Sequence, residues 1–114
     1  MLPRALRPMV AQGSCSIVNI TSVNGLAMSG NEAYSAAKVA SSASPTRSPC
    51  ATGPRGVRCD AITPGTIRTP AWEGRKRRDP EVMERMAQWC PMGPGGESDD
   101  VAGPGLFLAS DDAA

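Results

Sequence analysis

The sequence has no histidine and no two cysteines close enough to form a Cys-x-x-Cys motif. Its four cysteines are Cys15, Cys50, Cys59 and Cys90. Zinc sites built from cysteine and histidine need several such ligands at short, regular spacing. The sequence therefore predicts no metal site of this kind. Reduced thiols are the simpler expectation, and they favour a cytoplasmic protein.

Aromatic residues and net charge are both scarce, since the chain has four aromatic side chains and a net charge of +1. Few large aromatic groups leave little apolar surface for a core. A near-neutral chain is not built to bind a nucleic acid backbone. The one basic run, 75–78, is flanked by Glu73, Asp79 and Glu81. We interpret this run as a solvated surface loop, with a nucleic acid patch as the remote alternative.

Long hydrophobic segments are absent as well. No run reaches the roughly 18 apolar residues that a membrane span needs, and the N-terminus lacks the apolar region of a signal peptide. The sequence therefore predicts no membrane association. Its 114 residues, 40% of them hydrophobic, match a single globular domain.

Two short β-branched runs, 16–20 and 57–62, predict strands. Helices are predicted at about 3–12, 32–44, 80–89 and 97–110. A strand-helix-strand unit of this length predicts a parallel pair joined by a right-handed crossover. Two parallel strands do not make a stable sheet alone. The expected fold is therefore α/β, the later part of a larger domain, with 1–114 as a single incomplete domain.

The second predicted helix carries its own start and stop signals. Ser29 followed by Glu32 fits a capping box, in which each side chain satisfies a free amide. Pro45 and Pro49 should end the helix, because a proline inside it costs about 3 kcal/mol.

Tyr34, the only tyrosine, lies four residues before Lys38. Residues four apart share a helix face, and an ammonium beside a phenol lowers the phenol's pKa from about 10. Such a tyrosine can transfer a proton near neutral pH, as carbonyl reduction or alcohol oxidation requires. Ser22 follows a predicted strand, where ligands bind in open α/β sheets, and could hydrogen-bond the same substrate oxygen. The alternative for the pair alone is surface packing.

The order of these motifs resembles the short-chain dehydrogenase/reductase family. The matching stretches are "SIVNITS", "YSAAK", "GPRGVRCDAITPGTIRTP" and, more loosely, "DDVAGPGLFLAS". The resemblance implies a partial Rossmann-like doubly wound parallel sheet, truncated at both ends, which is the later, catalytic half of a dinucleotide-binding domain. It further implies NAD or NADP as cofactor, a small-molecule carbonyl or alcohol as substrate, and full-length relatives that are homo-oligomers.

By this resemblance, three side chains would be catalytic. Ser22 would polarise the carbonyl and Tyr34 would be the general acid/base. Lys38 would bind the nicotinamide ribose hydroxyls and lower the pKa of the tyrosine, so Tyr34 and Lys38 would also contact the cofactor.

The resemblance also matches 64–69 to the family's PGxxxT segment. In this segment Pro64, Gly65, Ile67 and Thr69 would bind the cofactor, with the backbone of Ile67 at the nicotinamide carboxamide and the Thr69 hydroxyl at the carboxamide or the pyrophosphate. Outside this context, an ordinary turn explains Pro64 and Gly65. Segment 72–89 would cover the substrate, with Met83, Met86 and Trp89 either lining a pocket or burying one helix face.

Two family features have no counterpart in the sequence. The glycine-rich turn that holds the pyrophosphate is absent, because the glycines at 93–96 follow no predicted strand. The catalytic asparagine is also absent. We therefore expect the isolated chain to have little or no activity. The alternative is a non-enzymatic truncated remnant or interaction module that keeps the family motifs by descent.

Overall fold

The structure is a computed structural model that describes residues 4, 6–27, 31–47, 53–93 and 95–113, with 43–47 described by their backbone only. The main elements are α1 (Leu6–Gln12), β1 (Cys15–Ile20), α2 (Glu32–Arg47), β2 (Val57–Ile62), α4 (Glu73–Arg78), α5 (Val82–Ala87) and α6 (Asp99–Ala109). Short 3-10 helices lie between these elements at η1 (Val23–Gly25), η2 (Gly53–Arg55) and η3 (Pro70–Trp72), and η4 (Asp111–Ala113) follows α6.

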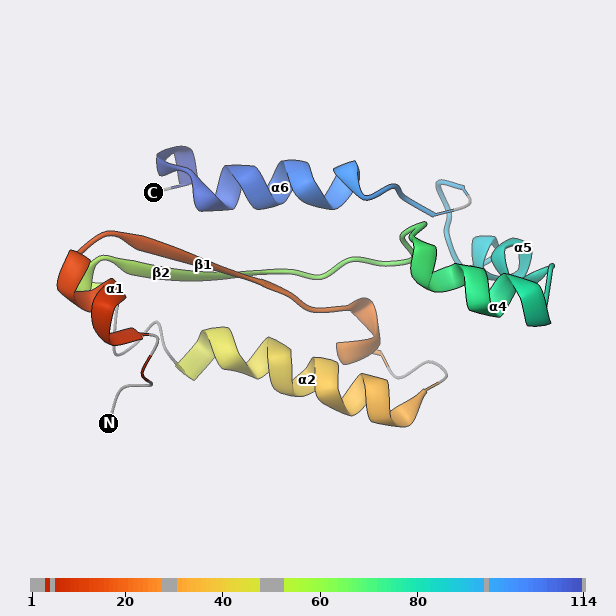
Figure 1. Cartoon of the computed structure of the whole chain (residues 1–114), viewed down its shortest axis with the longest axis horizontal. Helices are drawn as coiled ribbons and strands as arrows, with labels where there is room; N and C mark the ends of the chain where they lie inside the picture. The colour runs from red at the N-terminus through yellow and green to blue at the C-terminus, as the bar shows by residue number, and fades with distance from the viewer. Residues whose placement is uncertain (1–3, 5, 28–30, 48–52, 94, 114) are drawn as a thin grey trace.

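The two predicted strands form a parallel pair, with Cys15 opposite Val57 and Ile20 opposite Ile62. The pair lies between α6 on one side and α1 and α2 on the other (Figure 1). A parallel strand pair whose crossover contains a helix, covered on both faces by helices, is an α/β arrangement. The predicted fold class is thus confirmed, and β1 begins one residue earlier than expected.

The C-terminal end of α6 is fastened to the sheet by side chains of both strands. The Ser16 hydroxyl donates to the Leu108 carbonyl at 2.8 Å, and an Arg58 Nη2 donates to the Leu108 and Ser110 carbonyls at 3.0 and 2.9 Å. The last carbonyls of a helix lack intrahelical partners and carry a partial negative charge. A guanidinium therefore satisfies them and complements the helix dipole.

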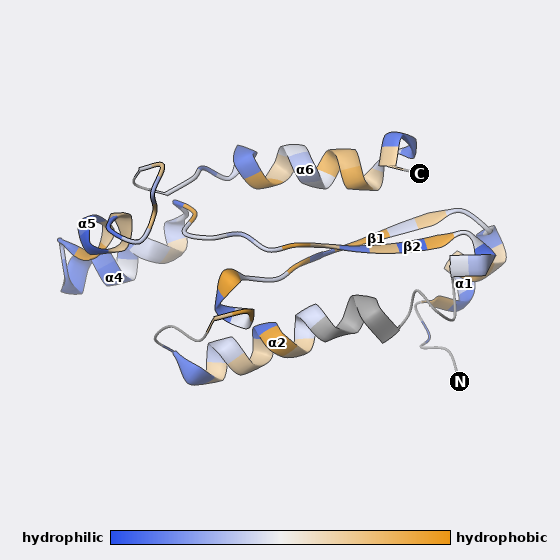
Figure 2. Ribbon diagram, turned by 180° about the vertical axis from the view of Figure 1, so that it is seen from behind, coloured by the Kyte–Doolittle hydropathy of each residue, from blue (hydrophilic) through white to orange (hydrophobic). Residues whose placement is uncertain are grey.

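The hydrophobic core is small. Among the described residues only Leu6 and Val57 are buried apolar side chains. The radius of gyration is 16.8 Å, whereas a compact domain of this length would have about 13 Å. Hydrophobic colouring follows β1 and β2, while α4, which extends beyond the end of the sheet, is mostly hydrophilic (Figure 2). The free energy of folding thus rests on little apolar burial.

Pro45 does not end α2 as predicted, and the helix predicted at 97–110 runs through Pro104. Helix α2 continues to Arg47 and includes Pro45, and Pro104 lies inside α6. Pro45 falls in the last turn of α2, where only two helical residues follow it. Pro49, the other predicted stop, lies outside the described residues.

Two further predictions of local structure were wrong or incomplete. The basic run 75–78 is not a loop but part of α4, in which Lys76 pairs with Glu73. The helix predicted at 80–89 is limited to α5. At the start of α2, Asn31 serves as the cap, because its Oδ1 accepts the Tyr34 amide at 3.0 Å; the predicted cap, Ser29, lies outside the described residues.

Burial in the sheet raises the pKa of the Cys59 thiol, and the neighbouring Asp60 carboxylate raises it further. A raised pKa leaves less thiolate at a given pH, and the thiolate is the reactive form. We expect iodoacetamide at pH 8 to modify Cys59 more slowly than Cys90, as measured by mass spectrometry of the tryptic peptides. Equal rates in the folded chain would contradict this, and equal rates in urea are the control.

Candidate active site

The end of β1 places two hydroxyl side chains in the interior. Thr21 and Ser22 are 3% and 8% exposed. The Thr21 hydroxyl donates to the Ile62 carbonyl at 3.0 Å and lies 2.9 Å from the Thr63 hydroxyl, which must therefore be the donor of that pair. Ser22 caps η1, since its Oγ accepts the Asn24 amide at 3.2 Å. The Ser22 hydroxyl hydrogen is not used in this bond and can be donated elsewhere.

Tyr34 and Lys38 lie together on α2, as their spacing predicts. The Lys38 ammonium lies 5.7 Å from the centroid of the Tyr34 ring, within the range of a cation–π contact. It also donates to the Ile20 carbonyl at 3.0 Å. The Tyr34 side chain remains 45% exposed. Lys38 thus links α2, which carries Tyr34, to Ile20, the last residue of β1 and two positions before Ser22.

A close backbone approach supports this arrangement. A Cβ on Gly25, in η1, would lie 3.1 Å from the Lys38 carbonyl carbon and 3.2 Å from the Val39 nitrogen. Only a residue without a side chain fits here without displacing α2. The turn after Ser22 and the middle of α2 are therefore packed backbone to backbone.

The predicted cofactor segment begins at the same end of the sheet. The Val23 amide donates to the Pro64 carbonyl at 3.1 Å, so Pro64 lies directly beside the turn that Ser22 caps. Gly65 follows and is exposed. In parallel sheets the carboxyl ends of the strands share one edge. Ser22, Lys38 and Pro64 are accordingly linked through hydrogen-bonded neighbours at this edge.

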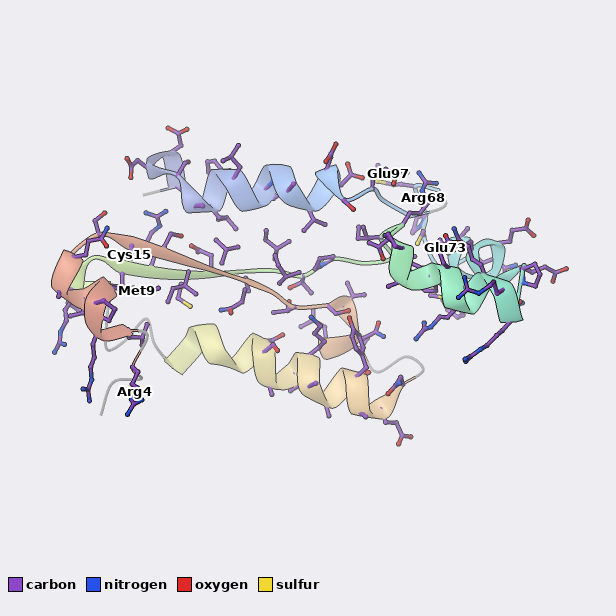
Figure 3. All side chains as sticks on the ribbon, viewed as in Figure 1. Arg4, Met9, Cys15, Arg68, Glu73 and Glu97 are labelled. Atoms are coloured by element: carbon purple, nitrogen blue, oxygen red, sulfur yellow. The ribbon has the colours of Figure 1, made fainter. Side chains whose placement is uncertain are left out.

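Ile67 and Thr69 lie farther along the same segment. Ile67 forms an isolated parallel bridge with Gly96, and Thr69 precedes η3 without a side-chain capping bond. The Trp72 indole donates to the Ile67 carbonyl at 2.9 Å. The Arg68 guanidinium pairs with Glu97 just beyond the bridge, as the two labelled side chains show in Figure 3. These contacts fix 66–69 against the chain that leads into α6.

The segment expected to cover the substrate consists of η3, α4 and α5. Met83 and Met86 are half-buried, whereas Trp89 is 82% exposed. One of the two alternatives was that Met83, Met86 and Trp89 bury one helix face. The exposure of Trp89 contradicts that alternative for this residue. Whether these residues line a substrate pocket stays a prediction.

Comparison with known proteins agrees with the arrangement of these elements. The family model described as Enoyl-(Acyl carrier protein) reductase matches residues 1–114. L-rhamnose-1-dehydrogenase of Scheffersomyces stipitis is 38% identical over 109 residues, which are 94% of this chain and 42% of that relative. The chain belongs to the short-chain dehydrogenase/reductase family.

Solved structures of this family superpose closely on the chain. An oxidoreductase of Burkholderia thailandensis has a TM-score of 0.90 at 42% identity, over 95% of this chain and 42% of that one. A 3-oxoacyl (acyl-carrier-protein) reductase of Agrobacterium tumefaciens, solved with NADP bound, has a TM-score of 0.85 at 30% identity, over 94% of this chain and 42% of that one. The chain thus spans less than half the length of these relatives, and its fold is part of the short-chain dehydrogenase/reductase Rossmann fold.

Sequence reasoning missed three residues at this edge: Asn31, Thr63 and Trp72. An asparagine just before a helical run is a common cap signal, so Asn31 could have been found. The pairing of Thr63 with Thr21 depends on strand register. The Trp72 contact depends on how η3 turns back on the preceding loop, for which the sequence has no signal.

Within the part of the chain that the structure describes, no helix combines the length and apolarity needed to cross a bilayer.

Proposed function

We propose that the chain carries the catalytic part of an oxidoreductase that transfers a hydride between NAD(P) and a small carbonyl or alcohol, with Tyr34 as general acid/base. The observation that supports this most is the contact of Lys38 with both the Tyr34 ring and the Ile20 carbonyl, two residues from buried Ser22. A serine, a phenol and an ammonium in this order suit a reaction in which one oxygen gains or loses a proton.

Each side chain has a separate role in the proposal. The Ser22 hydroxyl donates to the substrate oxygen, and Tyr34 gives its proton to that oxygen on reduction or takes it on oxidation. The Lys38 ammonium has three N–H donors, of which the Ile20 carbonyl uses one. The remaining donors are available for ribose hydroxyls.

The backbone of the Pro64–Thr69 segment suits the nicotinamide end of the cofactor. The bridge to Gly96 uses the Thr66 carbonyl and the Arg68 amide, so the Ile67 amide and carbonyl face the other way. The Thr69 hydroxyl is not used to cap η3. The bound dinucleotide would supply the hydride on reduction and accept it on oxidation. The choice between NAD and NADP stays open, although the Agrobacterium tumefaciens relative holds NADP.

The alternative is a non-enzymatic remnant or interaction module that keeps these motifs by descent. The small core and the two-stranded sheet favour it for the chain alone. We therefore also propose that residues 1–114, as one incomplete domain, have little or no turnover by themselves. A homo-oligomeric, cytoplasmic parent protein without nucleic acid or membrane partners stays a prediction.

A chimera separates the two possibilities. In L-rhamnose-1-dehydrogenase of Scheffersomyces stipitis, the matching segment would be replaced by residues 1–114 of this chain. We expect the folded chimera to oxidise L-rhamnose with NAD+ or NADP+, because the host supplies the glycine-rich turn that binds the pyrophosphate. The free chain, assayed in parallel by absorbance at 340 nm, is expected to show no saturable turnover.

Two outcomes would count against these proposals. A chimera that unfolds cooperatively yet is inactive would favour the non-enzymatic alternative. Saturable turnover by the free chain would refute the proposed inactivity but support the catalytic assignment.

A further inference from the structure

The amide and carbonyl of Ile67 do not take part in the bridge to Gly96, which uses the groups of its two neighbours. The Gly96 amide donates to the Thr66 carbonyl at 2.9 Å, and the Arg68 amide donates to the Gly96 carbonyl at 2.8 Å. In such a parallel bridge the amide and carbonyl of the central residue point toward the opposite edge. The Ile67 groups are therefore presented away from Gly96, on the side left to a ligand.

On that side, one of the two Ile67 groups is already engaged. The Trp72 indole N–H donates to the Ile67 carbonyl at 2.9 Å, whereas the Ile67 amide has no hydrogen-bond partner among the described residues. Trp72 makes two further contacts, one through its backbone and one through its ring. The Trp72 amide donates to the Thr69 carbonyl at 3.0 Å, and the Arg75 guanidinium lies 5.1 Å from the ring centroid.

A primary carboxamide needs both groups of such an edge, because its oxygen accepts and its NH2 donates. We propose that the Trp72 indole and the nicotinamide carboxamide compete for the Ile67 carbonyl, so that a bound carboxamide displaces the indole. The inference depends on the proposed function, in which the Ile67 backbone meets the carboxamide. The Ile67 amide would donate to the carboxamide oxygen, and the carboxamide NH2 would donate to the Ile67 carbonyl in place of the indole N–H.

Displacement of the indole has consequences for both affinity and motion. A ligand that must break a hydrogen bond of the free protein binds more weakly than it would to a chain without that bond. Since η3 leads directly into α4, movement of Trp72 would also shift the start of the segment thought to cover the substrate. Cofactor binding and movement of that segment would then be coupled.

The two tryptophans allow a matched experiment on the whole chain. Trp89→Phe leaves Trp72 as the only indole, and Trp72→Phe leaves Trp89, which is 82% exposed. The probe is nicotinamide mononucleotide at millimolar concentration, because it carries the carboxamide and ribose without the adenosine half. We expect it to shift the emission of the Trp89→Phe variant to longer wavelength and to increase acrylamide quenching, with no change in the Trp72→Phe variant.

Affinity provides the second measurement. Phenylalanine keeps the ring but cannot donate to Ile67, so Trp72→Phe is expected to bind the mononucleotide about two- to tenfold more tightly than the unmodified chain, as one hydrogen bond allows. Weaker binding by Trp72→Phe, or binding that leaves the Trp72 emission unchanged, would overturn the displacement while leaving the cofactor site intact. No binding by either the unmodified chain or Trp72→Phe would overturn the displacement and the proposed cofactor site together.

Discussion

Replacing Tyr34 by phenylalanine in the L-rhamnose-1-dehydrogenase chimera is expected to lower kcat by about 10²- to 10⁴-fold, the range that general acid–base catalysis contributes. The substitution removes one hydroxyl and retains the ring over which the Lys38 ammonium lies. Since Tyr34 is 45% exposed and its amide is capped by Asn31, the loss of the hydroxyl should leave α2 intact. The measurement is steady-state oxidation of L-rhamnose by the chimera and its variant.

Serine variants give this experiment an internal control. Ser22→Ala removes the buried hydroxyl beside the proposed substrate oxygen, whereas Ser41→Ala removes one that donates to the Ala37 carbonyl within α2. A large loss for Tyr34→Phe and Ser22→Ala, with little change for Ser41→Ala, would support acid–base catalysis at Tyr34. Retention of at least half the chimera's kcat in Tyr34→Phe would instead assign the proton to another group.

The regular elements were predictable because their signals are local. The β-branched runs of β1 and β2 and the four-residue spacing of Tyr34 and Lys38 lie within single strands or turns of helix. Helix α4 was missed because its sequence, EGRKRR, has no apolar face that would show a helical period. The continuation of α2 through Pro45 was missed because a proline marks the end of a helix only approximately.

The candidate site was less accessible to sequence reasoning than the strands. Motif order indicated Ser22, Tyr34, Lys38 and the segment that begins at Pro64, yet the contacts between them come from register and packing. The hydrogen bond from Lys38 to the Ile20 carbonyl requires α2 to pack close to the end of β1. Gly25 permits this short distance, because the η1 backbone can approach α2 where there is no side chain. No sequence motif indicates this close approach, because it depends only on the absence of a side chain at Gly25.

Gly56→Ala is expected to cause the largest loss of stability of any substitution considered. Gly56 has a φ of +74°, and an added Cβ would lie 1.9 Å from the Gly13 carbonyl oxygen. The left-handed backbone alone costs an L-residue about 1–2 kcal/mol, and the clash would separate the turn before β1 from the turn before β2. The Gly56 carbonyl accepts the Cys15 amide at 3.0 Å, so this displacement also opens the first bond between the strands.

Two alanine variants separate the contributions of backbone strain and steric clash. Gly13→Ala has the same strain at φ +77° but meets nothing within 4 Å, and Gly53→Ala has neither strain nor contact. We expect losses in the free energy of unfolding of about 0, 1–2 and more than 3 kcal/mol for Gly53→Ala, Gly13→Ala and Gly56→Ala, measured by urea titration of the far-ultraviolet circular dichroism. Because so few apolar side chains are buried, the last loss should abolish the cooperative transition. Equal losses for Gly13→Ala and Gly56→Ala would show that the two turns separate without cost, and that the strand pair does not depend on their contact.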